Sequence, residues 1–251
     1  MCKVMGIVNV TPDSFSDGGK FNTPEEAIRR AKNLVEEGAD IIDIGGESTR
    51  PGATPISWEE EWARIEPVIT SLGRDACPQA SAGVSEKRPY LLSVDTYHPE
   101  TAERAVAAGV KIVNCVYAEP VLDMLQICSK NGAELVMPAK SLGSVPKSLG
   151  SVPIYLDPMI GFGTTREEDL AILQTIPELA KKGRVLIGAS RKRIVKRLTG
   201  EKVPGKDLAG NLTIALWAAM NGASVVRVHD VRETVQALKV LAALKGEALP
   251  E

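Results

Sequence analysis

Residues 4–45 read VMGIVNVTPDSFSDGGKFNTPEEAIRRAKNLVEEGADIIDIG. The apolar runs Val4–Asn9 and Ile41–Gly45 have the length and residue types of buried strands. Between them, Thr23-Pro24-Glu25-Glu26 is typical of a helix start, because a capping oxygen is followed by proline and then, three residues on, by glutamate. This order of strand, helix and strand predicts two parallel strands joined by a right-handed crossover.

The same alternation continues along the whole chain. Eight apolar runs are expected to form strands: Val4–Asn9, Ile41–Gly45, Tyr90–Asp95, Val110–Asn114, Glu134–Met137, Ile154–Asp157, Val185–Gly188 and Ser224–His229. Similar helix caps begin at Ser57, Thr165 and Asp230. Eight strands alternating with helices in 251 residues predict an α/β protein, a (β/α)8 or TIM barrel that spans 1–251 as a single domain.

The connection between the fifth and sixth strands departs from this pattern. It is barely long enough for a parallel crossover, and it holds a direct repeat of SLGSVP at 141–146 and 148–153. Because its Gly, Pro and Ser content disfavours helix, we expect the helix here to be shortened or absent. A second loose stretch, Gly73–Pro89, is expected to be a surface loop at the lower end of the barrel.

Composition excludes several classes of protein. Hydrophobic residues make up 44% and charged residues 25%, and the formal charge of -2 gives no basic field for nucleic acid. We expect no membrane span, because no apolar stretch is long enough, and no signal peptide, because the first apolar run begins within a few residues of Met1. The four cysteines lack C-x-x-C spacing, which favours reduced thiols and a cytoplasmic location.

Polar side chains stand where the apolar runs stop. In a barrel the carboxyl ends of all strands meet at one rim, which is where such enzymes have their sites. Arg and His two residues apart on a strand point to the same side and form a good anion clamp. We therefore expect a site at the rim that takes a flat ring and an anion. The residues expected there are Asn9, Asp95, Asn114, Asp157, Lys192, Arg227 and His229.

Capping is the competing interpretation for such residues, since Asp, Asn and Ser after a strand often begin the next helix. We favour a capping role for Ser190 and Asp230, and a surface or capping role for His98. Asp157 is too far from the helix start near Thr165 to cap it, which favours a functional role. The basic run Arg191, Lys192, Arg193, Lys196 and Arg197 is compatible with an exposed helix face, except that Lys192 lies on the rim side.

Two long motifs follow the first two strands, MGIVNVTPDSFSDGG at 5–19 and GGESTRPG at 45–52. With Ser93-Val94-Asp95-Thr96, Asp157 through Gly163 and Arg227-Val228-His229-Asp230, they closely resemble the dihydropteroate synthase family of folate biosynthesis. The likeness spans almost the entire chain in the expected order. It implies a pterin-binding barrel that joins 4-aminobenzoate to (7,8-dihydropterin-6-yl)methyl diphosphate, giving 7,8-dihydropteroate and diphosphate.

The resemblance divides the rim residues between the two parts of the first substrate. It implies that the pterin is bound by Asp95, Asn114, Met137, Asp157 and Lys192. A carboxylate such as Asp157 suits the adjacent N–H donors of a pterin edge, and Asp95 would stabilise positive charge that develops in the ring. The diphosphate would be bound by Asn9, Arg50, Arg227 and His229, with Asn9 also holding Mg²⁺.

The second substrate is assigned in the same way. The resemblance implies that aminobenzoate contacts Thr49, Pro51, Phe162, Lys192 and Arg193, and that the catalytic residues are Asp95, Lys192, Arg227 and His229. The loop from Thr11 to Gly19 would close over the site once diphosphate is bound. It further implies a homodimer formed through barrel helices and competition by sulfonamides, which mimic aminobenzoate.

Several positions differ from the family pattern. The usual Asn-Asp after strand four is Asn114-Cys115, and Met-His-Met after strand five is Met137-Pro138-Ala139. Met159 replaces a glycine, Thr164 replaces a lysine, and Arg193 replaces a serine that meets the aminobenzoate carboxylate. Two alternatives stay open. One is a pterin-dependent methyltransferase of the same superfamily, which needs no diphosphate clamp. The other is a pterin-binding homologue without catalysis.

Overall fold

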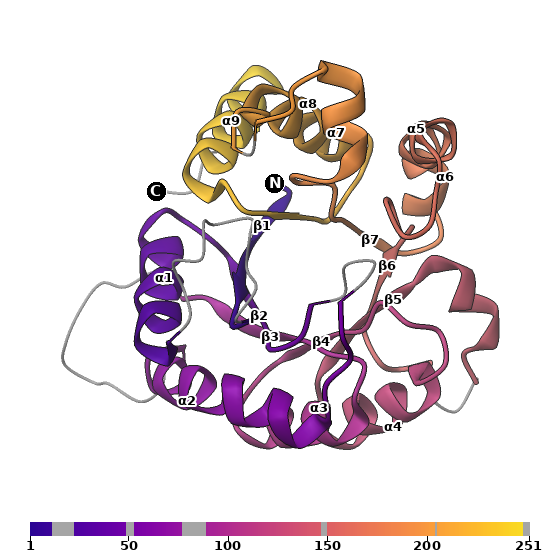
Figure 1. Ribbon diagram of the computed structural model, residues 1–251. Helices are drawn as coiled ribbons and strands as arrows, with labels where there is room; N and C mark the ends of the chain where they lie inside the picture. Colours follow the sequence, from indigo (N-terminus) through magenta and orange to yellow (C-terminus); the bar gives the residue numbers. More distant parts are fainter. Residues whose placement is uncertain (12–22, 49–52, 77–88, 147–149, 204, 248–251) are drawn as a thin grey trace.

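Eight parallel strands close into a barrel in the order in which they occur along the chain (Figure 1). The computed structural model describes residues 1–11, 23–48, 53–76, 89–146, 150–203 and 205–247. The strands are β1 Lys3–Asn9, β2 Ile41–Gly45, β3 Leu91–Asp95, β4 Ile112–Asn114, β5 Glu134–Pro138, β6 Ile154–Asp157, β7 Arg184–Ile187 and β8 Val225–Val228. The predicted strands and the predicted barrel are confirmed, with bounds that differ by at most two residues.

Helices surround most of the barrel (Figure 1). They are α1 Pro24–Glu36, α2 Trp58–Ala76, α3 Pro99–Ala107, α4 Val121–Asn131, α5 Arg166–Gln174, α6 Ile176–Ala180, α7 Arg193–Thr199, α8 Leu208–Met220 and α9 Val231–Leu244. Two short helices, α5 and α6, connect β6 to β7, and α7 and α8 together connect β7 to β8.

Three of the four predicted helix caps are made by side chains. Thr23, Ser57 and Thr165 each accept a hydrogen bond from the amide three residues later, and Thr165 and Glu168 form a complete capping box. Asp230 occupies the N-cap position of α9 but makes no capping bond. Its carboxylate instead accepts from Arg191 Nη2 at 2.7 Å, so the expected capping role of Asp230 is wrong.

The connection between β5 and β6 lacks an α-helix in its described part. A 3₁₀ helix, η2 Ala139–Ser144, stands there instead, and residues 147–149 lie outside the described residues. This confirms the predicted irregular unit. The expected loop at 73–89 is wrong at its start, because α2 continues to Ala76 while its residues Ile69 and Leu72 are fully buried. Residues 77–88 lie outside the described part.

Strand alternation divides the apolar core in two. The inner core fills the barrel and consists of Met5, Ile41, Ile112, Val136, Tyr155, Leu186 and Val225. The outer core lies between the strands and the helices, and it includes Val113, Cys115, Leu135, Met137 and Leu156. Because the inner core fills the lower part of the barrel, polar side chains can point inward only above it, toward the carboxyl ends of the strands.

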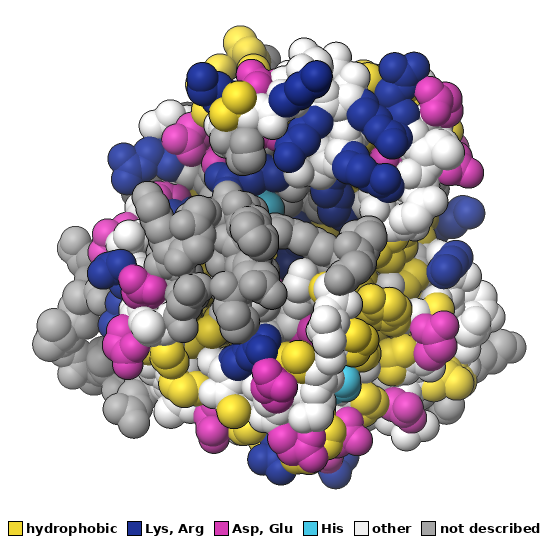
Figure 2. All heavy atoms as spheres, in the orientation of Figure 1, with side chains coloured by type: hydrophobic (Ala, Val, Ile, Leu, Met, Phe, Trp, Pro, Cys, Tyr) yellow, Lys and Arg dark blue, Asp and Glu magenta, His cyan; other side chains and the backbone are white. Residues whose placement is uncertain are grey.

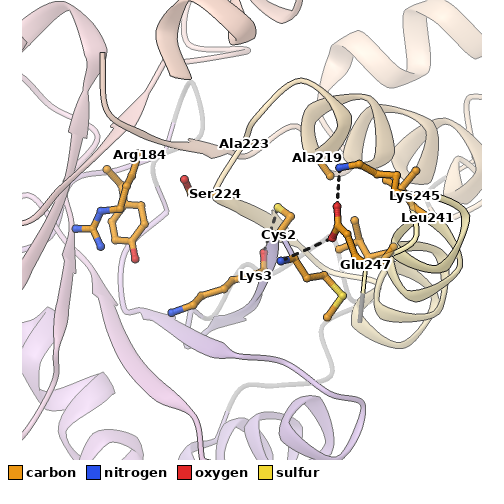
Figure 3. A pocket seen from close by; sticks show the side chains of 13 residues that line it. Cys2, Lys3, Arg184, Ala219, Ala223, Ser224, Leu241, Lys245 and Glu247 are labelled. Carbon is orange, nitrogen blue, oxygen red and sulfur yellow. Dashed lines mark hydrogen bonds and ion pairs between the residues drawn. The ribbon is translucent and has the colours of Figure 1, made fainter. Parts of the chain in front are cut away.

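A cavity of about 410 Å³ lies at the opposite, amino-terminal end of the barrel (Figure 3). Its lining includes Cys2, Lys3, Tyr155 and Arg184, and Glu247 accepts from Lys245 at 2.7 Å beside it. Because Lys3 and Arg184 begin their strands, this cavity lies at the other end of the barrel from the polar rim. Cysteines 2, 115 and 128 are free thiols. In the described ranges, every helix is too short or too polar to span a bilayer.

Candidate active site

Four polar side chains from four strands meet inside the barrel above the inner core. Arg227 of β8 donates from Nε to Asp43 Oδ2 at 2.6 Å and from Nη2 to Asp95 Oδ2. Asn114 of β4 donates from Nδ2 to the same Asp43 oxygen at 3.0 Å. Asn114 Oδ1 is buried and has no hydrogen bond within the described residues. The amide is therefore oriented by Asp43, and its oxygen is available to accept from a ligand.

Two carboxylates share the single guanidinium of Arg227, and this sets the charge of the centre. Burial raises the pKa of Asp95 to about 7, since the opposing attraction of Arg227 is offset by repulsion from Asp43 and Glu61. Burial disfavours the Arg227 charge, but Asp95 and Asp43 outweigh it and raise the pKa of Arg227 above its usual value. The centre thus holds a permanent cation beside a carboxyl that titrates near neutrality.

A second polar group lies after β6 and β7. Asp157, 6% exposed, accepts from the amide of Met159 at 2.7 Å. Lys192, the residue before α7, donates from Nζ to the carbonyl of Ile160 at 2.7 Å, and its ammonium lies 4.5 Å from the centre of the Phe162 ring. Each side chain is therefore held by a backbone group at the start of the turn after β6.

Burial acts on both charges of this group. It raises the pKa of Asp157, against the attraction of Lys192 and the Met159 amide. It also lowers the pKa of Lys192 to about 8, with Asp157 opposing the shift. A partly desolvated carboxylate and an ammonium that attract each other make strong hydrogen bonds to a ligand with both donors and acceptors.

Asn9 and His229 complete the described rim. Asn9 ends β1 next to Gly45, where a Cβ would lie 3.4 Å from Asp95 Cβ and 3.9 Å from Asn9 Oδ1. These are ordinary contact distances, so Asn9 and Asp95 approach Gly45 from the two neighbouring strands. His229 follows β8, is 9% exposed, and has Nδ1 at 3.1 Å from Ser190 Oγ.

The structure corrects the interpretations of Ser190 and Arg191 and confirms only the position of His98. Ser190 does not cap α7, because that position belongs to Lys192, and its hydroxyl instead contacts the His229 ring. His98 occupies the N-cap position of α3 without a capping bond, and its Nε2 lies 3.1 Å from Glu47 Oε2. Arg191 is not part of an exposed helix face, because its half-buried guanidinium is paired with Asp230.

The expected residues around aminobenzoate are only partly described. Phe162 lies in the turn after β6 under the Lys192 ammonium, and Arg193 Nη2 donates to the carbonyl of Thr164 at 3.4 Å on the outer side of that turn. Thr49, Arg50 and Pro51 lie outside the described residues, and so does the greater part of the 11–19 loop. The roles predicted for these residues stay predictions.

Met137 and Cys115 are not brought to the rim centre. Both side chains belong to the outer core, because alternation along β5 and β4 turns them toward the helices. The prediction that Met137 lines the pterin site is therefore not supported by its position. Cys115 likewise does not point into the barrel beside Asn114. Burial raises the pKa of the Cys115 thiol to about 12.

Sequence reasoning missed Asp43, which is fully buried and binds both Arg227 and Asn114. The signal was present, because a charged residue interrupts the apolar run Ile41–Gly45 at an inward-facing position. It also missed Asp169, whose carboxylate binds the turn after β6.

Basic side chains gather on one side of the rim. Figure 2 shows Lys and Arg side chains over the part of this face formed by α7. The basic stretch Lys192, Arg193, Lys196 and Arg197 belongs to this region. The arrangement gives the rim a cationic side, which suits an anionic ligand.

Comparisons with known proteins agree with this geometry. The chain matches the family described as "Pterin binding enzyme" over residues 5–149 and 147–229. It is 37% identical to the dihydropteroate synthase of Neisseria meningitidis serogroup B, with 96% of this chain and 92% of that protein covered. It is 33% identical to the dihydropteroate synthase of Escherichia coli K12, with 96% and 90% covered.

Solved structures show the same relationship. Dihydropteroate synthase of Xanthomonas albilineans with 4-aminobenzoic acid superposes with a TM-score of 0.83 at 38% identity, covering 99% of this chain and 94% of that one. The same protein in complex with 7,8-dihydropteroate gives 0.82 at 36% identity, with 99% and 95% covered. A Yersinia pestis dihydropteroate synthase with a sulfonamide drug gives 0.82 at 31% identity, with 98% and 94% covered.

Proposed function

Because the chain belongs to the pterin-binding enzyme family, and within it to the dihydropteroate synthases, we propose that its rim binds a pterin diphosphate and transfers the pterin methylene to 4-aminobenzoate. The products are 7,8-dihydropteroate and diphosphate. The chain is accordingly a transferase. The observation that carries the assignment of the site is that the strand ends bring three pterin-type partners to one rim, namely Asp157, Lys192 and Asn114.

Each member of this group matches one part of a pterin. The buried Asp157 carboxylate accepts from the adjacent N–H groups of the amino-pyrimidinone edge. Asn114 Oδ1, which has no hydrogen bond within the described residues, accepts a further ring donor. Lys192 Nζ donates to a ring carbonyl or nitrogen, at the cost of its present bond to the Ile160 carbonyl.

The reaction needs charge stabilisation rather than a strong base. The bond from the pterin methylene carbon to the diphosphate oxygen breaks, and the aromatic amine nitrogen forms a bond to that carbon and loses a proton. Positive charge spreads into the pterin as the C–O bond lengthens. The ionised carboxylate of Asp95, fixed by Arg227, stabilises that charge at the centre of the barrel.

The leaving diphosphate requires cationic partners. Arg227 keeps N–H groups beyond the two that bind Asp43 and Asp95, and His229 lies on the same side of the strand end. We assign the diphosphate to these residues together with Asn9 and Arg50. Arg50 is assigned from the family motif alone, since it lies outside the described residues.

Mg²⁺ fits the residues present at Asn9. Proteins commonly hold Mg²⁺ with one or two oxygens while substrate phosphates supply others, and Asn9 Oδ1 is an amide oxygen of this kind at the end of β1, beside Gly45 and close to Asp95. In the described ranges no group of three or more His, Cys, Asp or Glu forms a metal site of its own. Bound there, the ion would neutralise charge on the departing diphosphate.

For the second substrate we propose a position against Phe162 and Lys192. Thr49 and Pro51 are assigned to it from the family motif alone, since they lie outside the described residues. We assign the aminobenzoate carboxylate to Arg193, because its guanidinium lies at the same turn as Phe162. To bind the carboxylate, Arg193 would release the Thr164 carbonyl. Sulfonamides, as aminobenzoate mimics, would compete at this position. A methyltransferase function is not favoured, because the curated relatives are dihydropteroate synthases.

A homodimer formed through α7, α8 and α9 is the proposed assembly. Among the residues that the structure describes, nine large apolar side chains are exposed, and six of them lie on these helices or between them: Leu198, Val203, Trp217, Met220, Val240 and Leu244. Such a concentration of apolar surface marks an interaction site. For location we propose the cytoplasm, because free thiols such as Cys2 persist under reducing conditions.

The test of the function is release of diphosphate from the pterin substrate in the presence of Mg²⁺. We expect release to depend on added aminobenzoate and to be lost in Lys192→Met, which keeps the aliphatic stem but removes the ammonium. Measurable pterin binding without diphosphate release would contradict the proposal and favour a homologue without catalysis.

A further inference from the structure

Asp169 is a buried carboxylate that the proposed chemistry does not use. It lies in the first turn of α5 but is only 2% exposed, whereas its neighbours Glu167 and Glu168 are exposed. The amino end of α5 does not need it, since Thr165 and Glu168 already form a complete capping box. The burial of Asp169 therefore calls for a different partner.

That partner is the turn after β6. Asp169 Oδ1 accepts from the Gly161 amide at 2.8 Å and from the Thr164 hydroxyl at 2.5 Å. The Gly161 amide also lies 3.0 Å from Thr164 Oγ1. One carboxylate oxygen thus binds both ends of the segment Gly161–Thr164, and bonds to a charged acceptor in a buried site are the strong ones.

The turn needs such support because its backbone is strained. Met159 has φ 68°, and Gly161 and Gly163 have φ 78° and 75°. A residue with a Cβ pays a conformational cost in this left-handed region, and such a conformation persists only where surrounding contacts fix it. The bonds of Asp169 and Thr164 are contacts of that kind.

The same turn contacts Lys192 through a carbonyl and an aromatic ring. The Ile160 carbonyl accepts from Lys192 Nζ, and Phe162 lies under the same ammonium. A Cβ at Gly161 would lie 3.0 Å from Lys192 Cδ, so the backbone and the lysine stem are in close contact. Asp169 also favours the charged form of Lys192, although burial, Asp157, Arg227 and Asp95 have larger effects on its pKa.

We propose that Asp169 and Thr164 are positioning residues, which fix the turn 159–164 so that its carbonyl and aromatic ring place the Lys192 ammonium in the pterin site. The inference rests on the proposed function, because it takes Lys192 as a substrate contact. Neither residue touches substrate itself. Their effect on binding passes through Lys192.

Two pairs of variants separate positioning from simple stability. Asp169→Ala and Thr164→Val remove the acceptor and the donor, while Asp169→Asn and Thr164→Ser retain an oxygen in the same place. We expect Asp169→Ala and Thr164→Val to weaken the binding of a pterin ligand about tenfold by calorimetry, and Asp169→Asn and Thr164→Ser to recover most of that loss. Glu167→Gln is the matched control, because it removes a first-turn acid of α5 that is exposed.

A double-mutant cycle with Lys192→Met tests the route of the effect. We expect Thr164→Val to leave pterin affinity unchanged in the Lys192→Met background, because the group that it positions is gone. An equal loss in both backgrounds would overturn the inference, and so would full affinity in Asp169→Ala or Thr164→Val. If the wild-type chain itself bound no pterin, the proposed function and the inference would both fail. Wild-type binding without coupling overturns the inference alone.

Discussion

The guanidinium of Arg227 is hydrogen bonded to Asp95 across the barrel, although the two residues are 132 positions apart in the chain. The same guanidinium binds Asp43, whose second oxygen, Oδ1, is buried without a partner in the described part of the chain. Barrel closure alone brings these groups together. The charge balance of the site therefore depends on the register of β2, β3 and β8.

Removing one carboxylate of this arrangement should destabilise the protein. We expect Asp43→Ala to lower the free energy of unfolding by about 3 kcal/mol, because it leaves part of the buried Arg227 charge uncompensated and Asn114 without its acceptor. Urea unfolding measures the change. The control is Asp123→Ala, which changes an exposed side chain of α4 and should cost no more than about 0.5 kcal/mol. Equal effects of the two variants would show that the Asp43 bonds contribute nothing.

The pH dependence of kcat/KM should be bell-shaped. Asp95, whose pKa is about 7, must be ionised to stabilise positive charge, so the rate should rise as pH increases through 7. Lys192, whose pKa is about 8, must be protonated to donate, so the rate should fall as pH increases through 8. In Lys192→Arg the alkaline decline should disappear, since a guanidinium stays charged. An unchanged alkaline limb in that variant would exclude Lys192 as its origin.

Two positions of the turn after β6, 159 and 161, have a left-handed backbone that favours glycine, so substitutions there should change stability in opposite directions. We expect Gly161→Ala to destabilise the protein by about 1–2 kcal/mol, because its φ is 78° and the new Cβ would contact Lys192 Cδ. Met159→Gly should be neutral or slightly stabilising, because φ 68° at Met159 is strained for any residue with a Cβ. Thermal unfolding measures both, and a marked loss of stability in Met159→Gly would contradict the second expectation.

Asp157→Asn tests the pterin assignment directly. An amide cannot accept both edge donors, so we expect pterin affinity to fall by at least tenfold, as an unsatisfied buried donor costs about 1–3 kcal/mol. Calorimetry with a pterin ligand measures the change, and circular dichroism checks that the barrel is intact. Unchanged affinity would refute the role of Asp157.

Much of this site could be predicted from sequence because strand ends carry a local signal. Asn114, Asp157, Lys192 and Arg227 each follow or end an apolar run, and a parallel barrel brings such ends to one rim. The side-chain directions were harder to predict at strand ends. Met137 was expected in the site, but alternation from the inner-core residue Val136 turns it outward.

The sequence did not reveal which side chains the polar residues at the helix starts bind. Ser190, Asp230 and His98 stand where helix caps are common, yet each binds a side chain from elsewhere in the chain. Local pattern cannot show such contacts, because they depend on which loops the closed barrel places side by side. Asp169 was missed for the same reason, since a first-turn acid ordinarily needs no further explanation.

The central claim is tested most directly by the stoichiometry of the products. Pterin diphosphate, Mg²⁺ and isotopically labelled 4-aminobenzoate are incubated with the protein, and labelled product and diphosphate are quantified by mass spectrometry and a coupled phosphate assay. We predict one labelled 7,8-dihydropteroate for each diphosphate released. Diphosphate release without labelled product, or neither product despite bound pterin, would contradict the claim that this rim joins the two substrates.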